Sequence, residues 1–175
     1  MSRRIVTLLT DFGQGGPYVA ALKGVILSAA PETVLVDVTH AISPQNILEG
    51  AFVLGGVHGE FPSGTVHLAV VDPGVGTDRR LIAARAGDSW FVLPDNGLIT
   101  GVARSTTIDE VRLLANPALR RARVSRTFHG RDILAPAAAF LASGGNPEEL
   151  GPVVDSASLV MLEMLDPAED DLGLV

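Results

Sequence analysis

The sequence predicts an α/β domain with a mostly parallel central sheet and helices on both faces. Apolar runs of strand length alternate with longer apolar segments of helix length, a pattern typical of such domains. The run 65–71 is dominated by apolar residues, as in a parallel strand that is buried on both faces. Segments rich in glycine, proline, asparagine and aspartate separate the runs and mark turns and helix ends.

The apolar runs and their boundaries place the strands. We expect strands at 5–10, 33–37, 65–71, 81–86, 90–93 and 107–113. The fourth and fifth flank the turn Ala86-Gly87-Asp88, which predicts a hairpin.

Four helices are expected between and after these strands. Proline suits the first turn of a helix and cannot continue one, so Pro17 and Pro31 bound the first. Asn46 and Glu49 form a capping-box pattern at the start of the second. The expected helices span 17–30, 46–61, a short stretch after residue 97, and 132–142.

The composition restricts the class of protein. The chain has 175 residues, of which 47% are hydrophobic and 19% are charged, which predicts one globular domain with a sizeable core. No apolar run is long enough to cross a bilayer, and no signal-peptide pattern follows Met1. The absence of cysteine excludes disulfides, thiolate nucleophiles and thiolate metal sites. These features favour a cytoplasmic protein.

The charge of the chain bears on its partners. A formal net charge of -7 argues against general nucleic-acid binding. Five arginines nevertheless cluster before the last helix, where they form either a solvated basic loop or a surface for an anion or a partner. They are Arg120, Arg121, Arg123, Arg126 and Arg131.

Three aspartates lie at the ends of predicted strands, namely Asp11, Asp37 and Asp72. Ligands of open α/β sheets bind beyond the carboxyl ends of the strands. A carboxylate there can accept both hydroxyls of a ribose diol, or bind a metal or another cation. The alternative is that each carboxylate caps a helix or a turn.

One histidine stands out by its position. His129 comes just before the last helix, and Gly130 leaves room beside its ring. His40 follows the second strand and can be structural or functional, whereas His58 and His67 fit a helix end and a strand core. The sequence contains no His-Glu-x-x-His, EF-hand, Walker A, G-x-G-x-x-G or G-x-S-x-G motif.

Several segments together resemble one family, the S-adenosyl-L-methionine (SAM) hydroxide adenosyltransferases or SAM hydrolases, relatives of the fluorinating and chlorinating enzymes. The resemblance extends over residues 4–152. It rests on Thr10-Asp11-Phe12-Gly13, Tyr18-Val19, Lys23-Gly24, Val36-Asp37-Val38-Thr39-His40, Pro44, Phe61-Pro62-Ser63-Gly64-Thr65-Val66-His67, Val71-Asp72-Pro73-Gly74-Val75-Gly76-Thr77, Arg79, Pro94-Asp95-Asn96-Gly97 and Thr127-Phe128-His129-Gly130-Arg131-Asp132.

The resemblance implies conversion of SAM and water to adenosine and methionine by attack at the 5′ carbon, without a metal or redox cofactor. It implies that Asp72, Arg79 and His129 hold the water. The halogenases carry tyrosines in place of this aspartate and this histidine, so the chain is more similar to the hydrolases. The implied substrate-binding residues are Asp11 for the ribose hydroxyls, Phe128, Gln45 and Asn46 around the sugar and sulfonium, and also Phe12, Val75, Asp95, Asn96 and Gly130.

The resemblance also predicts domains and assembly. Residues 1–155 correspond to the N-terminal domain of the family, and 156–175 are expected to be a remnant of the linker to an absent C-terminal β domain. Family members form trimers that bind SAM between subunits, and Gly16 replaces an acidic residue that helps to hold the methionine part. The alternatives are an inactive trimeric scaffold, a weak nucleoside-binding protein and a halogenase.

Overall fold

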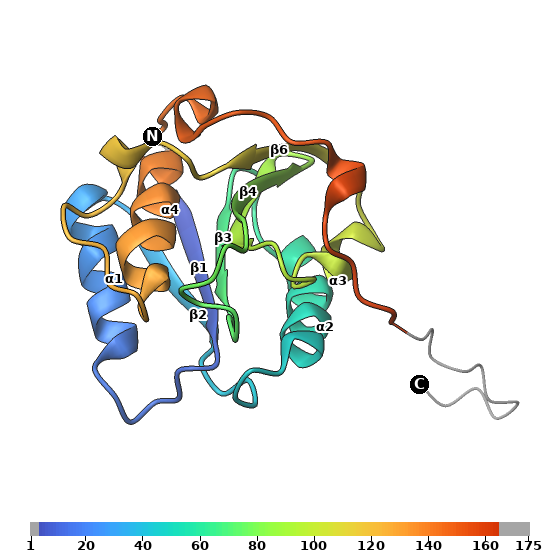
Figure 1. Cartoon of the computed structure of the whole chain (residues 1–175), viewed down its shortest axis with the longest axis horizontal. Coiled ribbons are helices and arrows are strands. Elements are labelled where there is room, and N and C mark those ends of the chain that lie inside the picture. Colours follow the sequence, from blue (N-terminus) through green and yellow to red (C-terminus); the bar gives the residue numbers. More distant parts are fainter. Residues whose placement is uncertain (1–3, 165–175) are drawn as a thin grey trace, which may run out of the picture.

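The computed structural model describes residues 4–164 and shows a six-stranded sheet between two layers of helices (Figure 1). The strands lie in the order β2-β1-β3-β5-β4-β6. They are β1 (Ile5–Thr10), β2 (Val34–Thr39), β3 (Val66–Val70), β4 (Leu81–Ala86), β5 (Ser89–Pro94) and β6 (Ile108–Leu113). Each predicted strand is present, with ends close to those expected.

The sheet contains both parallel and antiparallel strand pairs. β1 pairs in parallel with β2 and with β3, and β3 pairs in parallel with β5. β4 lies antiparallel between β5 and β6. The expectation of a mostly parallel sheet is therefore correct for the β2-β1-β3-β5 part only. No helix separates β4 from β5, so the tight turn at Gly87 returns the chain as an antiparallel hairpin.

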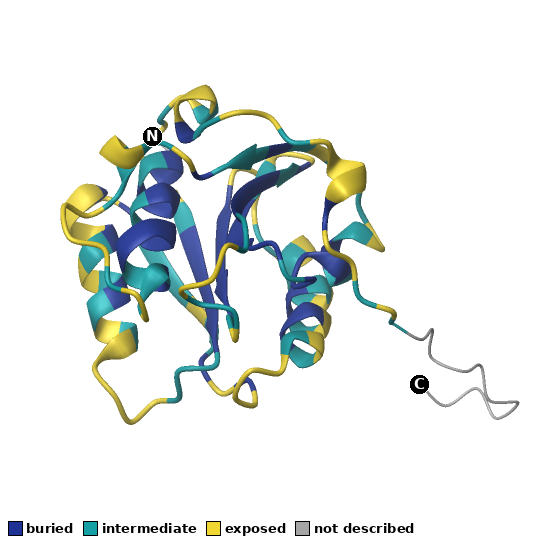
Figure 2. Ribbon diagram, viewed as in Figure 1, coloured by how far each residue is buried: buried dark blue, intermediate teal, exposed yellow. Residues whose placement is uncertain are grey.

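Helices cover both faces of the sheet, as expected. One group of buried side chains joins the sheet to α1 and α4 and includes Leu22, Leu68 and Ala138. A second group joins the other face to α2 and α3 and includes Leu54 and Phe91. In Figure 2 the buried positions of the helices face the sheet between them. The helices are α1 (Tyr18–Ala29), α2 (Ile47–Val57), α3 (Thr100–Ala103) and α4 (Ala135–Ala142).

None of the helices in the described part of the chain is long and apolar enough to cross a membrane. Short 3-10 helices complete the fold at His58–Glu60, Pro117–Leu119, Pro147–Leu150 and Ser156–Ser158.

Two helix starts show how local sequence sets the fold. Asn46 caps α2 as predicted by accepting a hydrogen bond from the backbone N–H of Glu49 at 3.1 Å. The other half of the capping box differs, because the Glu49 carboxylate accepts from the backbone N–H of Ser43 at 3.0 Å and not from that of Asn46. The expected helix 132–142 begins earlier, with a π-helical turn over Gly130–Leu134. Pro136 has no N–H to donate to the carbonyl of Asp132, and that carbonyl instead accepts from the backbone N–H of Arg121 at 3.0 Å.

The last described segment, 151–164, packs along β6 and α3. The backbone N–H of Val154 donates to the carbonyl of Val111 at 2.8 Å, and Leu159 is buried in the second core group. The expected apolar piece 159–165 thus begins with a packed residue. Leu165 and the acidic stretch 166–171 lie outside the described residues, and the boundary between 155 and 156 stays a prediction.

β3 carries a fully buried histidine at the centre of the sheet. The Nδ1 of His67 lies 2.8 Å from Thr7 Oγ1, and its ring stacks on Phe91 with a centroid distance of 4.7 Å. Burial, together with the charge of His58, lowers the pKa of His67 to about 4. His67 is therefore a core residue that stays neutral at neutral pH.

The lowered pKa of His67 should make the stability of the protein depend on pH. Between pH 6.5, its ordinary pKa, and pH 4, the unfolded chain binds the proton and the folded chain does not. The free energy of unfolding should therefore decrease as the pH is lowered from 6.5 to 4, and this group should contribute about 3 kcal/mol to the decrease. Urea denaturation of the wild type and of His67→Gln at pH 7 and 4.5 measures the effect. An identical pH dependence of the two proteins would contradict it.

Candidate functional site

The candidate site lies where β1 and β3 end. Asp11 follows β1 directly, and Asp72 comes two residues after β3. Because these strands are parallel neighbours, their carboxyl ends lie side by side at one edge of the sheet. Ligands of open α/β sheets bind at this edge.

Asp72 is paired with Arg79 across a short loop, residues 72–80. The Nε of Arg79 donates to Asp72 Oδ1 at 2.6 Å, and its Nη2 donates to Asp72 Oδ2. The side chains of Asp72 and Arg79 are 5% and 10% exposed. A bidentate pair that is this buried holds carboxylate and guanidinium in one relative orientation.

His129 contacts the same arginine, so the structure brings all three predicted catalytic residues together. Its Nδ1 lies 3.1 Å from Arg79 Nη2. A guanidinium can only donate, so Nδ1 accepts, and the neutral ring carries its proton on Nε2. Burial lowers the pKa of His129, and the neighbouring Arg79 cation lowers it further. The site therefore combines a carboxylate, a guanidinium and a neutral imidazole.

The segment that carries His129 lies very close to the sheet. A methyl group on Gly130 would lie 3.1 Å from Val70 Cγ1 and 3.5 Å from Phe12 Cζ. A side chain here would shift the Val70 side chain by a few tenths of an ångström, whereas its contact with Phe12 would be ordinary, so glycine allows the approach without strain. This residue therefore helps to place His129 beside the end of β3.

Asp132 anchors the basic segment before His129, and the sequence analysis missed this role. Its buried carboxylate accepts from the backbone N–H of Ser125 at 2.8 Å and from Arg131 Nε at 2.7 Å, and lies 3.5 Å from Arg121 Nη1. Burial by itself would raise the pKa of Asp132, but hydrogen bonds from Arg131 and Ser125 outweigh it and the pKa is lowered. A single acid beside five arginines is the signal that indicates such an anchor.

Asp11 connects the end of β1 to the turn before α2. Its Oδ2 accepts from the backbone N–H of Gln45 at 2.8 Å, and within residues 4–164 its Oδ1 has no hydrogen-bond partner. Gln45 has a φ of 65° and is the one non-glycine residue of the described chain in the left-handed region. Such backbone strain is typical of functional sites. The neighbouring Asn46 uses its side-chain oxygen to cap α2.

Three aromatic rings form an apolar wall beside these polar groups. The ring centroids of Phe12 and Phe128 are 5.6 Å apart, and that of Tyr18 lies 5.3 Å from Phe128. Tyr18 is 53% exposed, and the guanidinium of Arg131 lies over the Phe128 ring at 4.8 Å. Phe12 and Phe128 were predicted to bind the substrate, whereas Tyr18 was noted only as part of a motif.

Three other predicted binding residues lie in or beneath the 72–80 loop. Val75 is half-buried within it and donates from its backbone N–H to the carbonyl of Asp72 at 3.2 Å. Asp95 is buried, and both of its carboxylate oxygens accept hydrogen bonds from within the chain. The side-chain amide of Asn96 donates to the carbonyl of Val71 at 2.9 Å. The polar atoms of Asp95 and Asn96 thus bind the protein itself.

Asp37 does not lie at a strand end, contrary to expectation. β2 extends to Thr39, so Asp37 is inside it. Its carboxylate lies 2.6 Å from Lys23 Nζ and 3.0 Å from His40 Nε2. Since the Nδ1 of His40 lies 2.9 Å from Thr10 Oγ1, this group of side chains ties β1, α1 and β2 together beneath Asp11.

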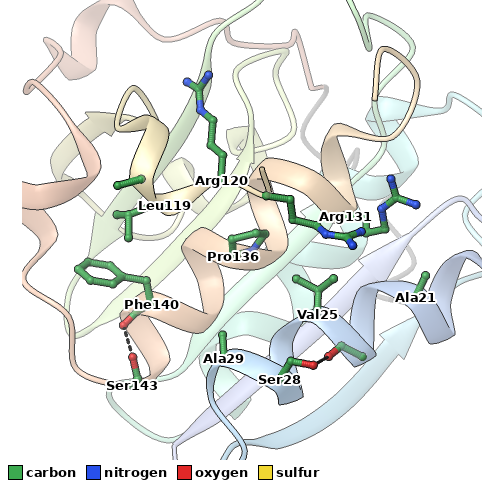
Figure 3. A pocket seen from close by; sticks show the side chains of 13 residues that line it. Ala21, Val25, Ser28, Ala29, Leu119, Arg120, Arg131, Pro136, Phe140 and Ser143 are labelled. Atoms are coloured by element: carbon green, nitrogen blue, oxygen red, sulfur yellow. Dashed lines mark hydrogen bonds between the residues drawn. The ribbon is translucent and has the colours of Figure 1, made fainter. Parts of the chain in front are cut away.

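A separate groove of approximately 730 Å³ lies between α1 and α4. Figure 3 shows Ala21, Val25 and Ser28 of α1 on one side and Pro136 and Phe140 of α4 on the other. Arg120, Arg121 and Arg131 also line it, so part of the predicted basic cluster faces this groove. Asp72, Arg79 and His129 do not line it.

The chemistry available at the β1–β3 edge follows from its groups. Among residues 4–164, no group of three or more histidine and acidic side chains is arranged to hold a metal ion. A guanidinium held by a carboxylate beside a neutral imidazole can bind and orient a polar molecule of the size of water. The carboxylate of Asp11, at the end of β1, can accept hydroxyl groups.

Comparison with known proteins matches residues 6–151 to the SAM hydroxide adenosyltransferase N-terminal domain. The chain is 44% identical over 158 residues to the "(R)-S-adenosyl-L-methionine hydrolase" of Salinispora arenicola, covering 90% of this chain and 60% of the relative. It is 29% identical over 196 residues to the "Fluorinase" of Nocardia brasiliensis, covering 97% of this chain and 65% of that protein.

The fold is shared with proteins of known structure. A crystal structure of a Thermotoga maritima protein superposes with a TM-score of 0.89 at 40% identity, covering 93% of this chain and 63% of that one. The chain thus spans about 60% of the length of the first curated relatives that it matches.

Proposed function

Since this chain belongs to the SAM hydroxide adenosyltransferase family, we propose that it hydrolyses S-adenosyl-L-methionine to adenosine and L-methionine. The observation that carries the proposal is the contact of Asp72, Arg79 and His129 at the β1–β3 edge. Greater identity to the hydrolases than to the fluorinases supports hydrolysis over halogenation.

The reaction is an in-line displacement by water at the 5′ carbon of the ribose. The oxygen of water forms a bond to this carbon while the carbon–sulfur bond breaks, and the electron pair of that bond returns to the sulfonium sulfur. The leaving group departs as the neutral thioether of methionine, so no general acid is required. The difficulty lies in the nucleophile, because water is barely ionised at neutral pH.

The three residues address this difficulty. The guanidinium of Arg79 stabilises the negative charge that develops on the water oxygen. Asp72 holds the guanidinium in one orientation. The water is therefore bound close to the geometry that the reaction needs. Because Nδ1 of His129 already accepts from Arg79 and Nε2 carries the proton, we assign the proton of the attacking water to the Asp72 carboxylate, from which it passes to solvent.

The remaining residues bind the nucleoside in this proposal. The free Oδ1 of Asp11 accepts the ribose hydroxyls, while Oδ2 stays bonded to Gln45. Phe128 and Phe12 cover the sugar and the sulfonium, which an aromatic face attracts as a cation. The chemistry needs no metal or redox cofactor. We also propose a homotrimeric assembly and a cytoplasmic location, by the family resemblance and the absence of cysteine.

Incubation of the purified chain with SAM tests the proposed function. We expect adenosine and methionine in equal amounts, measured by chromatography against a protein-free blank. A parallel sample contains the remaining C-terminal part of the Salinispora arenicola relative, because the chain spans only part of that protein. No adenosine in either sample would reject hydrolysis. Absence of heat with SAM and adenosine in calorimetry would then support the scaffold, and halogenated nucleoside in the presence of halide would support the halogenase.

A further inference from the structure

The turn Pro94–Gly97 lies beneath the 72–80 loop and binds the start of that loop. The side-chain amide of Asn96 donates to the carbonyl of Val71 at 2.9 Å. Its oxygen accepts from the backbone N–H of Leu98 at 3.2 Å, so the side chain is held at both ends. Asn96 therefore fixes the residue that directly precedes Asp72.

The same turn binds the end of the loop. The Oδ2 of Asp95 accepts from Arg80 Nε at 2.7 Å, and the backbone N–H of Asp95 donates to the carbonyl of Arg80 at 3.0 Å. The Asp95 side chain is 1% exposed, and its Oδ1 accepts from the backbone N–H of Val160 at 2.9 Å. Both the backbone and the side chain of Arg80 are thus fixed directly after Arg79.

Between these two ends the loop is bonded mainly to itself. The backbone N–H of Val75 donates to the carbonyl of Asp72 at 3.2 Å, and that of Thr77 donates to Gly74 at 3.1 Å. With the Asp72–Arg79 pair these bonds make a closed unit. The direction in which such a unit presents its carboxylate and guanidinium depends on how its two ends are held.

We propose that the Pro94–Gly97 turn positions the Asp72–Arg79 pair against His129, with Asn96 and Asp95 as positioning residues rather than substrate contacts. The role in catalysis rests on the proposed function, whereas the structural role does not. Both side chains act through other residues, Asn96 through Val71 and Asp95 through Arg80.

Asn96→Ala separates positioning from substrate contact by kinetics. Because a displacement of the water-holding pair affects the chemical step, we expect kcat to fall about 10- to 100-fold. KM should stay within about threefold of the wild type. Asn116→Ala is the matched control, since Asn116 also joins two segments, through Ala118 N–H and the Glu149 carbonyl. Its kcat should be unchanged. A rise in KM at constant kcat would overturn the proposal in favour of substrate contact.

The NMR titration of His129 gives a readout that needs no activity. In the wild type the pKa of this ring is lowered by burial and by Arg79. In Asn96→Ala the pKa of His129 should rise toward 6.5, because Arg79 and Asp72 move away together and the lowering effect of Arg79 is larger than the raising effect of Asp72; in Asn116→Ala it should not change. An unchanged His129 titration in folded Asn96→Ala overturns the proposal. If the wild type releases no adenosine, hydrolysis is rejected while this measurement still decides the role of the turn.

A second variant covers the case in which Asn96→Ala does not fold. Asn96→Ser keeps a side-chain oxygen that can accept from the Leu98 N–H, as serine does in turns, loses the amide that donates to Val71, and adds no charge near His129. The same change in the His129 titration is expected, and its absence in this folded variant overturns the proposal.

Discussion

Replacing Asp72 by asparagine is expected to lower the rate of SAM hydrolysis by about 10³-fold. The amide cannot take the proton of the attacking water, and it cannot balance the charge of Arg79. Because Asp72 and Arg79 are almost fully buried, the unpaired guanidinium should also reduce the free energy of unfolding by about 3 kcal/mol. Adenosine release and urea denaturation measure the two effects.

The double variant Asp72→Asn/Arg79→Gln distinguishes lost chemistry from lost stability. Removing both charges should restore most of the free energy of unfolding, because no unpaired charge remains, while hydrolysis stays lost. Asp109→Asn is the control, since Asp109 forms a more exposed ion pair with Arg85 at 3.5 Å, worth less than about 1 kcal/mol. Turnover of Asp72→Asn within tenfold of the wild type would exclude Asp72 from the reaction.

The fold could be predicted well from local signals. Apolar runs between glycine and proline placed every strand, and Asn46 with Glu49 placed the start of α2. The antiparallel hairpin of β4 and β5 was predicted from its turn, whereas the antiparallel pairing of β6 with β4 was missed because it is a long-range contact. The π-helical turn before α4 was missed because it depends on Pro136 and on the distant Arg121 together.

The proximity of the candidate catalytic residues could be predicted from the sequence, whereas the contacts that hold them in place could not. Asp72, Arg79 and His129 come together as expected. In the sequence, an acid at a strand end looks the same whether its carboxylate keeps a free oxygen, as for Asp11, or has both oxygens bound within the protein, as for Asp95. Only the tertiary partners distinguish these cases, and no partner of Asp95 is within ten residues of it in the sequence.

Asp132 lies outside the proposed catalytic group, and its replacement tests how the segment that carries His129 is held. Asp132→Asn removes the charge that holds Arg131, Arg121 and the backbone N–H of Ser125. Because the arginines left unpaired are partly exposed to solvent, we expect the free energy of unfolding to fall by about 1 to 2 kcal/mol, and hydrolysis to slow by about tenfold through displacement of His129. Hydrogen exchange at the Ser125 amide should become faster.

The difference in free energy of unfolding between the wild type and Asp132→Asn should depend on pH, and this dependence identifies the ionised carboxylate as its cause. The pKa of Asp132 is lowered in the folded chain from its ordinary value of 3.8. Its stabilising contribution is therefore fully present above pH 3.8 and is lost as the pH falls through the lowered value. The free energies of unfolding of the wild type and of Asp132→Asn should therefore become more similar in that acid range. The control Asp155→Asn alters an exposed cap on the Ala157 amide and should change the free energy of unfolding by less than about 0.5 kcal/mol, because asparagine caps about as well as aspartate. If Ser125 exchange in Asp132→Asn matches the wild type, Asp132 does not hold the segment that presents His129.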